Sequence, residues 1–430
     1  MDWKELYRNK LISAEQAVGK IFSGSSVVTS HAAAEPQTIL RAMASHKENF
    51  RNVRIFNLMS MGELPTCQPG MESHFLHNTT FVSMGTREAV NTGRACFTTS
   101  FYSETPWLLR EVIPVDVAVL SLSRPDRHGY CSFGVTLDYQ RLLAEKAGVV
   151  IAQVNELMPR THGDCFIHVS QLDYIVEVSE PLPELPEPRI GDVERGIGKN
   201  CASLIRDGDT LQLGIGAIPD AVLLFLKDKN DLGIHSEMFS DGVAELMEMG
   251  VITNRAKTLN RDVSVATFLI GSKRLYDFVD DNPSIRMFPV DYTNNPCIIA
   301  QNDNMVAINS CLQVDLYGQV AADTLGPKQY SGAGGQVDFV RGANMSRGGR
   351  AIFAVPSTAA GGKESRIVAD LKPGAAVTTT RNDVNYVVTE YGVAQLKGKT
   401  LRARALALAA IAHPAFRDQL YEEANRRFWI

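Results

Sequence analysis

The chain has 430 residues, 45% of them hydrophobic and 21% charged, which is ordinary globular composition with enough apolar material for two cores. The formal net charge is −5 and no basic block is present, which argues against nucleic acid or an anionic membrane as a partner. The opening stretch MDWKELYRNKLISAEQ is charged and unlike a signal peptide, and no run of residues is apolar enough to span a bilayer. We therefore expect a cytoplasmic protein of two domains.

The cysteines and histidines predict neither disulfides nor a metal site. The seven cysteines are scattered, odd in number and contain no CxxC pair, which is typical of reduced thiols in a cytosol. The nine histidines form no HxxxH or HExxH pattern, so the sequence gives no support for a metal ion.

Short apolar runs rich in β-branched residues alternate with helical patterns along the chain. Such runs are typical of strands buried on both faces, and their alternation with helices predicts α/β layers with mostly parallel sheets. The clearest of these runs are Val115–Leu122, Gly148–Val154, Val263–Ile270, Ala351–Val355 and Asn385–Thr389.

A proline-rich segment divides the chain. Ser179–Gly191 reads SEPLPELPEPRIG, and its prolines cannot continue a helix or a central strand, so we interpret it as an extended linker between domains 1–183 and 184–430. A weak repeat relates the two halves: Ser23–Leu40 and Asp207–Leu223 both run from a glycine turn through an apolar strand and a small-residue loop to a proline and a helical pattern. Chance similarity of two βα units would give the same spacing.

The second of these units contains the first candidate site. Leu211–Leu213 is expected to be a strand, Gly214–Ile218 a loop of small residues, and Pro219 the start of a helix. Glycines let a backbone approach a ligand, and the N–H groups at a helix start suit an anion. An ordinary tight turn between strand and helix has the same pattern.

A second candidate is the segment GIHSEMFSDG, in which Glu237 follows a short predicted strand that ends near Ser236. In open α/β sheets ligands bind at this edge, so a carboxylate there is a candidate nucleophile or base, although a solvated loop glutamate is the simpler alternative. A helix is expected to begin near Asp241, capped by Ser240 or by Asp241 itself.

Two further segments have similar features. The run SGAGGQVDF contains three glycines, Gly335 the last of them, which indicates close backbone approach or a flexible loop. In VVTEYG, Glu390 again ends an apolar strand. Taken singly, each of these segments is as compatible with a structural role as with a catalytic one.

Taken in order, LQLGIGAIPDAV, GIHSEMFSDGV, NSCLQVDLYGQV, SGAGGQVDFVRGA and VVTEYGVAQLKGK closely resemble class I CoA-transferases of the acetyl-CoA hydrolase/transferase family. The similarity covers nearly the whole chain, and it is greatest to the branch of 4-hydroxybutyrate CoA-transferase and butyryl-CoA:acetate CoA-transferase. The resemblance implies two related open α/β domains with the active site in the cleft between them.

The resemblance also implies roles for individual residues. Glu237 matches the catalytic glutamate, Glu390 a second carboxylate of the site, and the backbone amides of Ile215 and Gly335 match oxyanion donors. The chain departs from the family after VPST, where a lysine is expected nearer position 360, so Lys363 is assigned to the CoA phosphates instead. The full CoA-binding set implied by the resemblance is Gly214, Ile215, Gly216, Ala217, Ile218, Leu312, Gly335 and Lys363.

The implied activity is exchange of CoA between a short-chain acyl-CoA, such as acetyl-, butyryl- or succinyl-CoA, and an acid such as 4-hydroxybutyrate, butyrate or itaconate. The chemistry would follow a ping-pong course through a glutamyl-CoA thioester, with CoA thioesters as substrates and no tightly bound cofactor or metal. An acyl-CoA hydrolase or a non-catalytic CoA-binding protein would have a similar sequence. The family also implies a homodimer or higher homo-oligomer, for which the apolar segment Leu406–Ile411 gives weak support.

Overall fold

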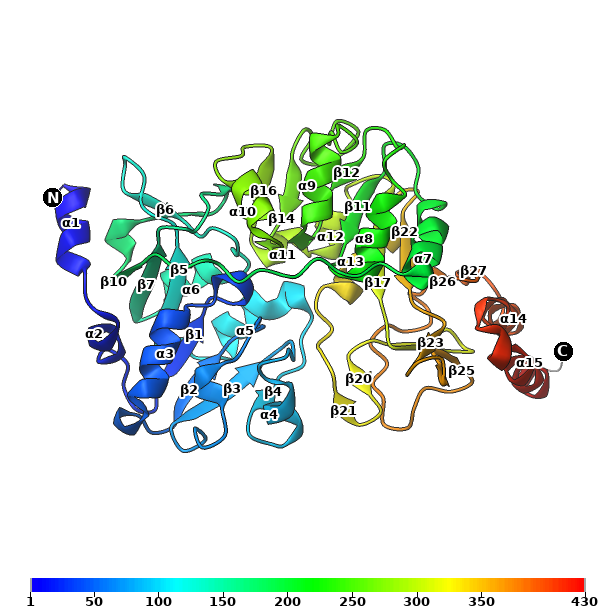
Figure 1. The fold of residues 1–430 in the computed structure, drawn as a ribbon, viewed down its shortest axis with the longest axis horizontal. Helices are drawn as coiled ribbons and strands as arrows, with labels where there is room; N and C mark the ends of the chain where they lie inside the picture. The colour runs from blue at the N-terminus through cyan, green and yellow to red at the C-terminus, as the bar shows by residue number, and fades with distance from the viewer. Residues whose placement is uncertain (1, 429–430) are drawn as a thin grey trace. The chain divides into compact units, whose positions relative to one another are not determined.

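The computed structural model describes residues 2–428 and has a mixed α/β fold with mostly parallel sheets, as the sequence predicts. The chain forms two compact units, drawn together in Figure 1. Unit 1 comprises Met1–Pro186 and Val265–Thr293, and unit 2 comprises Glu187–Ser264 and Asn294–Ile430. None of the helices within residues 2–428 is both long and apolar enough to cross a bilayer.

Unit 1 is built on a seven-stranded sheet in which every neighbouring pair of strands is parallel, in the order β10-β7-β5-β1-β2-β3-β4. Parallel strands need covering on both faces, and the central strands of this sheet are accordingly almost wholly buried. The strands are β1 (Ser26–Thr29), β2 (Val53–Phe56), β3 (Phe75–Thr79), β4 (Cys96–Phe97), β5 (Val117–Leu122), β7 (Val149–Asn155) and β10 (Tyr174–Val178).

The helices of unit 1 cover this sheet. Ile39, Leu40 and Met43 of α3 pack with Val27 and Ile55 of the strands in one buried cluster. The helices are α1 (Trp3–Lys10), α2 (Ala14–Val18), α3 (Gln37–Ser45), α4 (Arg87–Asn91), α5 (Thr105–Glu111), α6 (Gln140–Lys146), α10 (Lys273–Val279) and α11 (Val290–Thr293). Short 3₁₀ turns lie at Ala32–Ala34, Lys47–Asn49, Pro65–Cys67, Tyr102–Glu104 and Val169–Gln171.

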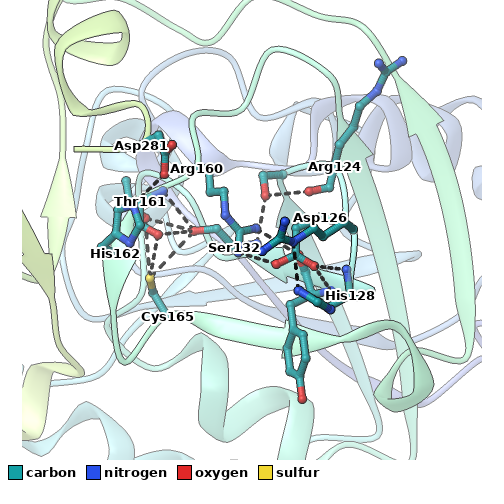
Figure 2. Close-up of polar contacts among 12 residues, drawn as sticks. Arg124, Asp126, His128, Ser132, Arg160, Thr161, His162, Cys165 and Asp281 are labelled. Atoms are coloured by element: carbon teal, nitrogen blue, oxygen red, sulfur yellow. Dashed lines mark hydrogen bonds and ion pairs between the residues drawn. The ribbon is translucent and has the colours of Figure 1, made fainter. Parts of the chain in front are cut away.

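A polar network, drawn in Figure 2, fixes the short strands of unit 1. The Arg160 guanidinium bonds the Asp126 carboxylate at 2.8 Å and the Tyr130 carbonyl at 3.0 Å, while His162 bonds Asp281 at 2.8 Å. These contacts join segments that are distant in sequence and add to the short sheet pairings of the same segments. The short strands are β6 (Tyr130–Ser132), β8 (His162–Gly163), β9 (Phe166–His168), β14 (Ser264–Ala266), β15 (Phe268–Leu269) and β16 (Ile285–Met287).

Unit 2 is built on a six-stranded sheet in the order β12-β11-β17-β22-β26-β27, parallel except for the last pair (Figure 1). Its strands are β11 (Thr210–Leu213), β12 (Gly233–Ile234), β17 (Met305–Ser310), β22 (Arg350–Ala354), β26 (Tyr386–Thr389) and β27 (Gly392–Gln395). Shorter strands follow in the loops: β13 (Met238–Phe239), β18 (Gln313–Asp315), β19 (Val320–Ala321), β20 (Thr324–Leu325), β21 (Lys328–Gln329), β23 (Thr358–Ala359), β24 (Glu364–Ser365) and β25 (Ile367–Val368).

The helices of unit 2 form its core with the strands. Phe339 of α13 and Leu408 of α14 pack with Phe353 of β22 and Val387 of β26 in a cluster that is closed to solvent. The helices are α7 (Asp192–Ala202), α8 (Ala217–Leu224), α9 (Asp241–Glu248), α12 (Pro296–Ile299), α13 (Gln336–Met345), α14 (Leu401–Ile411) and α15 (Pro414–Phe428).

The two sheets share a strand order. The order β10-β7-β5-β1-β2 in unit 1 corresponds, strand by strand, to the order β26-β22-β17-β11-β12 in unit 2. The two segments of the sequence repeat supply the matching strands β1 and β11, so the topology agrees with the proposed relation between the halves.

Two local predictions need correction. The expected strand Val263–Ile270 is interrupted at Thr267, and the expected start of a helix at Pro219 falls two residues late, because α8 begins at Ala217. Proline is tolerated there since the N–H groups of a first helical turn have no acceptor within the helix.

Candidate active site

Four of the segments singled out in the sequence follow strands of the unit 2 sheet, at its carboxyl edge. The loop Gly214–Ile218 follows β11, Glu237 follows β12, Leu312 follows β17 and Glu390 follows β26. The strand order reverses at β11, because the chain first adds β12 on one side of β11 and later adds β17 on the other. Ligands of open α/β sheets bind beside such a switch point.

The segment that leads to Glu237 is tied to the neighbouring strand β11 at successive residues. The His235 N–H donates to the Leu211 carbonyl at 3.1 Å, and the Ser236 hydroxyl donates to the Leu213 carbonyl at 3.1 Å. Both His235 and Ser236 are buried. The backbone that carries Glu237 is therefore fixed by the sheet.

Two N–H donors hold the Glu237 carboxylate. The Asn294 amide nitrogen donates to Oε2 of Glu237 at 2.8 Å, and the backbone N–H of Gly335 also hydrogen-bonds this carboxylate. Asn294 is fully buried, and its amide oxygen has no hydrogen-bond partner among the described residues. Two nitrogen donors thus contact the carboxylate that the sequence assigns to catalysis.

A residue larger than glycine does not fit at position 335. A Cβ atom built there would lie 1.9 Å from Oε2 of Glu237 and 2.3 Å from the Asn294 amide nitrogen. Gly335 is the residue before α13, so its N–H belongs to the start of that helix and carries the positive end of the helix dipole. The glycine lets this N–H reach the carboxylate directly.

Burial raises the pKa of Glu237 to about 7, while the hydrogen bonds from Asn294 and the Gly335 backbone act to lower it. The residue keeps part of its surface accessible. A carboxylate that is partly desolvated, held by two donors and still reachable from solvent has the properties of an enzymatic nucleophile.

The glycine loop after β11 is more open. Ile215 is 38% exposed, and Gly216 has φ +103°, a conformation that favours glycine, directly before α8. Leu312 is partly buried at the end of β17. Within residues 2–428, no hydrogen bond joins the Ile215 amide to Glu237, so the oxyanion role of Ile215 stays a prediction.

The structure places Glu390 and Lys363 apart from the Glu237 carboxylate's own contacts. Glu390 accepts hydrogen bonds from the Ser357 backbone N–H at 2.9 Å and from the Ser357 hydroxyl. Lys363 is exposed in the turn between β23 and β24. Neither bonds Glu237 in the described part of the chain, and their assigned roles stay predictions.

Asn294 is the residue that sequence reasoning missed. It lies in the stretch YTNNPC, directly before the Asn295 cap of the short helix α12, and 57 positions beyond Glu237. An Asn-Asn-Pro turn signals only a helix start. Nothing in the local pattern indicates that the first asparagine faces a carboxylate.

The described residues contain no cluster of three or more His, Cys, Asp or Glu side chains arranged to hold a metal ion. All seven cysteines are free in the structure, five of them buried and two exposed. The fold and site together define an α/β protein of two topologically similar units with a restrained carboxylate at the edge of one sheet.

Comparison with known proteins identifies the family. Residues 1–186 match the model of the acetyl-CoA hydrolase/transferase N-terminal domain, and residues 271–424 match that of the C-terminal domain. The chain belongs to the acetyl-CoA hydrolase/transferase family. It is a CoA-transferase, acting on CoA thioesters and small carboxylates.

Relatives match from end to end. The 4-hydroxybutyrate coenzyme A transferase of Clostridium kluyveri is 59% identical over 100% of both chains, and the butyryl-CoA:acetate CoA-transferase of Anaerostipes caccae is 38% identical over 99% of this chain and 98% of its own. The crystal structure of 4-hydroxybutyrate CoA-transferase from Porphyromonas gingivalis superposes with a TM-score of 0.87 at 48% identity, covering 99% of this chain and 100% of that one. Acetyl-CoA hydrolases of two yeasts match only 50% and 49% of this chain, at 29% and 31% identity.

Proposed function

We propose that Glu237 is the nucleophile of this CoA-transferase and carries CoA as a glutamyl thioester between two half-reactions. The observation that supports this most directly is the pair of donors on its carboxylate, Asn294 at 2.8 Å and the N–H of Gly335. A solvent-exposed glutamate without a catalytic role would need neither a glycine at position 335 nor a fully buried amide as its hydrogen-bond partner.

The chemistry needs a carboxylate because CoA itself moves. An oxygen of Glu237 attacks the acyl-CoA carbonyl and the C–S bond breaks. CoA departs as a thiolate, and a mixed anhydride remains on Glu237. The thiolate then attacks the glutamyl carbonyl, the anhydride C–O bond breaks, and the first acid departs as a carboxylate. A second acid reverses both steps and leaves with CoA, which gives ping-pong kinetics. Ser236 or Cys311 would transfer the acyl group instead.

The two donors serve the second attack as well. When thiolate adds to the glutamyl carbonyl, negative charge develops on a glutamyl oxygen, and Asn294 and Gly335 already donate to this carboxyl group. Donors fixed in this way stabilise such an oxyanion, and the loss of one typically reduces the rate about 10²–10³-fold. The same contacts therefore orient Glu237 as a nucleophile and stabilise it as an electrophile.

We assign the acid substrate to short carboxylates, with 4-hydroxybutyrate first because the 59% identical relative carries that name, followed by butyrate and acetate. Itaconate and other dicarboxylates belong in the same panel. CoA would lie along Gly214–Ile218 and Leu312, with Lys363 on its phosphates, and no tightly bound cofactor takes part. The protein would act in the cytoplasm as a homodimer or a larger homo-oligomer.

Trapping the intermediate tests the proposal. Incubated with acetyl- or butyryl-CoA and no acceptor acid, the enzyme should accumulate an adduct, and borohydride should reduce the thioester to an alcohol and inactivate the enzyme. Peptide mass mapping should place the reduced residue at Glu237. An adduct on Ser236, Cys311 or Glu390 would contradict the mechanism.

Substitutions complete the test. Glu237→Gln keeps the shape but is a poor nucleophile, so transfer should be abolished. Glu237→Asp retracts the carboxylate by one methylene and should lose about 10² in rate while still binding CoA. Glu245→Gln, on the exposed face of α9 beside Lys227, is the matched control and should behave as wild type. Transfer within tenfold of wild type in Glu237→Gln would rule Glu237 out.

The alternatives differ in what ends the reaction. A transferase releases CoA only when a second carboxylate is present, whereas an acyl-CoA hydrolase releases it with water alone. A CoA-binding protein without turnover would show neither CoA release nor an adduct. Measuring free thiol with and without 4-hydroxybutyrate, butyrate and itaconate separates the three and ranks the acids.

A further inference from the structure

Lys257 is a buried lysine that the proposed mechanism does not use. The residue is 2% exposed, and its ammonium donates to the carbonyl of Ile234 at 2.7 Å and to the carbonyl of Val263 at 2.7 Å. No carboxylate among the described residues pairs with it, and burial lowers the pKa of Lys257 to about 7. Burying an amine without a counter-ion costs free energy, so we expect Lys257 to have a specific role.

That role concerns strand β12, the outermost strand of the unit 2 sheet. On its inner side β12 pairs with β11, but on its outer side no long strand continues the sheet. Leu232 pairs there with Ile252 in an isolated bridge. Two residues later, at Ile234, side chains supply the hydrogen bonds instead of a neighbouring strand. The Asn254 amide oxygen accepts from the Ile234 N–H at 2.9 Å, and Lys257 donates to the Ile234 carbonyl.

The packing around Lys257 is shaped for this contact. A Cβ at Gly233 would lie 2.4 Å from Cγ and 2.8 Å from Cδ of Lys257, so the aliphatic stem lies against the bare backbone of β12. Gly233 does not have an unusual φ, so its lack of a side chain serves the approach of the lysine. The stem and the ammonium together bind the end of the strand from outside.

We propose that Lys257 is a positioning residue for Glu237, holding the Ile234 carbonyl so that the chain leaves β12 in the direction that brings the carboxylate to Asn294 and Gly335. This inference rests on the proposed role of Glu237. Ile234 is three residues before Glu237. The two residues between them, His235 and Ser236, are both hydrogen-bonded to β11. Ile234 is thus a point at which the outer side of this segment is tied.

The size of the effect follows from geometry. Without the lysine, the carbonyls of Ile234 and Val263 lose a donor inside the protein, and the segment is expected to shift so that they reach another partner. A displacement of about 1 Å at a reacting group can cost roughly 10² in rate. CoA binding would change little, because the loop Gly214–Ile218 follows a different strand.

The test compares Lys257→Met with Lys257→Gln. Both side chains are uncharged and similar in bulk, but only glutamine offers N–H donors to the two carbonyls. Lys257→Met should lower kcat by about 10–100-fold with KM for acyl-CoA changed less than about threefold, and Lys257→Gln should recover a clear part of that loss. Lys227→Met, on the surface of unit 2, is the control and should match wild type.

The outcomes are separable from those of the proposed function. If wild type forms no adduct on Glu237, the mechanism fails; if it does and Lys257→Met keeps kcat within twofold, only the positioning role fails. The positioning role is also overturned if the Met and Gln variants lose the same amount of kcat and this loss parallels their loss of thermal stability. That pattern would indicate a purely structural residue. If Lys257→Met does not fold, Gly233→Ala displaces the stem while keeping the lysine, and unchanged kcat there would refute the inference.

Discussion

The pKa of Glu237 results from two opposed effects, and a pH profile measures their balance. Burial raises this pKa to about 7, and the hydrogen bonds from Asn294 and Gly335 restrain the rise. Because the ionised carboxylate is the nucleophile in the proposed mechanism, kcat/KM should increase with pH through a limb near pH 7. The acid substrates ionise well below this range, so the limb reports on the enzyme.

Removing Asn294 gives the direction of the shift. Its hydrogen bond favours the ionised form, so in Asn294→Ala the limb should move to higher pH, and the loss of activity should be greater at pH 6 than at pH 8.5. Asn230→Ala, which removes a surface contact with Asp207, is the control and should leave the limb in place. An unshifted limb in Asn294→Ala would mean that this amide does not interact with the ionising group.

At this scale the sequence singled out Glu237 and Gly335, which the structure places in contact, while their catalytic roles stay predictions. Glu237 and Gly335 belong to motifs whose residue order is distinctive, so pattern and resemblance both indicate them. Asn294 was missed because its role depends on a contact across 57 positions, which no local pattern contains. The same limit applies to Lys257, which in the sequence is one lysine among many.

Among the elements of unit 2, a buried ion pair joins the starts of two strands that are not neighbours. Asp209, just before β11, bonds Arg350 at the start of β22 with 2.6 Å between Oδ1 and Nη2, and β17 lies between the two strands. Arg350 also donates to the Leu204 carbonyl at 2.7 Å. Burial raises the pKa of Asp209 although Arg350 acts to lower it, as expected for a pair held away from water.

Breaking this pair should destabilise unit 2 without altering the chemistry. Asp209→Ala leaves the Arg350 guanidinium buried without its partner, and we expect a loss of about 3–5 kcal/mol in the free energy of unfolding. The double variant Asp209→Leu with Arg350→Met should recover most of it, because it removes both charges. The pair lies at the amino ends of the strands, so kcat of the folded protein should be unchanged.

Chemical denaturation monitored by circular dichroism gives the measurement. The exposed pair Lys227 and Glu245 provides the comparison, since breaking a surface pair should cost less than about 1 kcal/mol. A loss in Asp209→Ala no larger than that of the surface pair would show that the buried pair does not support the sheet.

The strands were the elements that the sequence predicted best. Short, mainly apolar runs such as Val117–Leu122 favour buried strands, because they are too short for a typical helix and rich in β-branched residues. The run Val263–Ile270 failed because the backbone changes partners within it: the Thr267 carbonyl accepts from Leu137, and the Leu269 N–H donates to Val135. Such a change depends on distant residues and leaves no mark on the hydrophobic pattern.

At the scale of the whole molecule, the chain returns to unit 1 after leaving it. Residues 265–293 belong to unit 1 although unit 2 has already begun at Glu187. This return could not be predicted, because the proline-rich linker is the only break visible in the composition of the sequence. The division at 183/184, the cleft between domains and the homo-oligomeric state stay predictions. The apolar segment Leu406–Ile411 no longer supports assembly, since Leu408, Ala409 and Ile411 are buried in the core of unit 2.

The return segment is held in unit 1 by specific contacts. The Val290 N–H donates to the Asp138 carbonyl at 3.0 Å, and the ring of Phe268 packs edge-on against Tyr102 with centroids 6.2 Å apart. The linker is bound on the same side, where the Tyr276 hydroxyl donates to the Pro183 carbonyl at 2.7 Å. Covalent continuity at the linker is therefore not what joins the two halves of the chain.

A cut in the linker tests this arrangement. The backbone from Pro186 to Ile190 has no regular secondary structure, and Arg189 is exposed, so a recognition site for a specific protease inserted between Pro188 and Arg189 should be cleaved in the folded protein. The two fragments should then migrate as one particle with the mass of the intact 47.2 kDa chain, or a multiple of it, in native mass spectrometry. They should separate only in denaturant, because the C-terminal fragment supplies residues 265–293 to unit 1. Fragments that part under native conditions would show instead that 1–183 and 184–430 are independent domains.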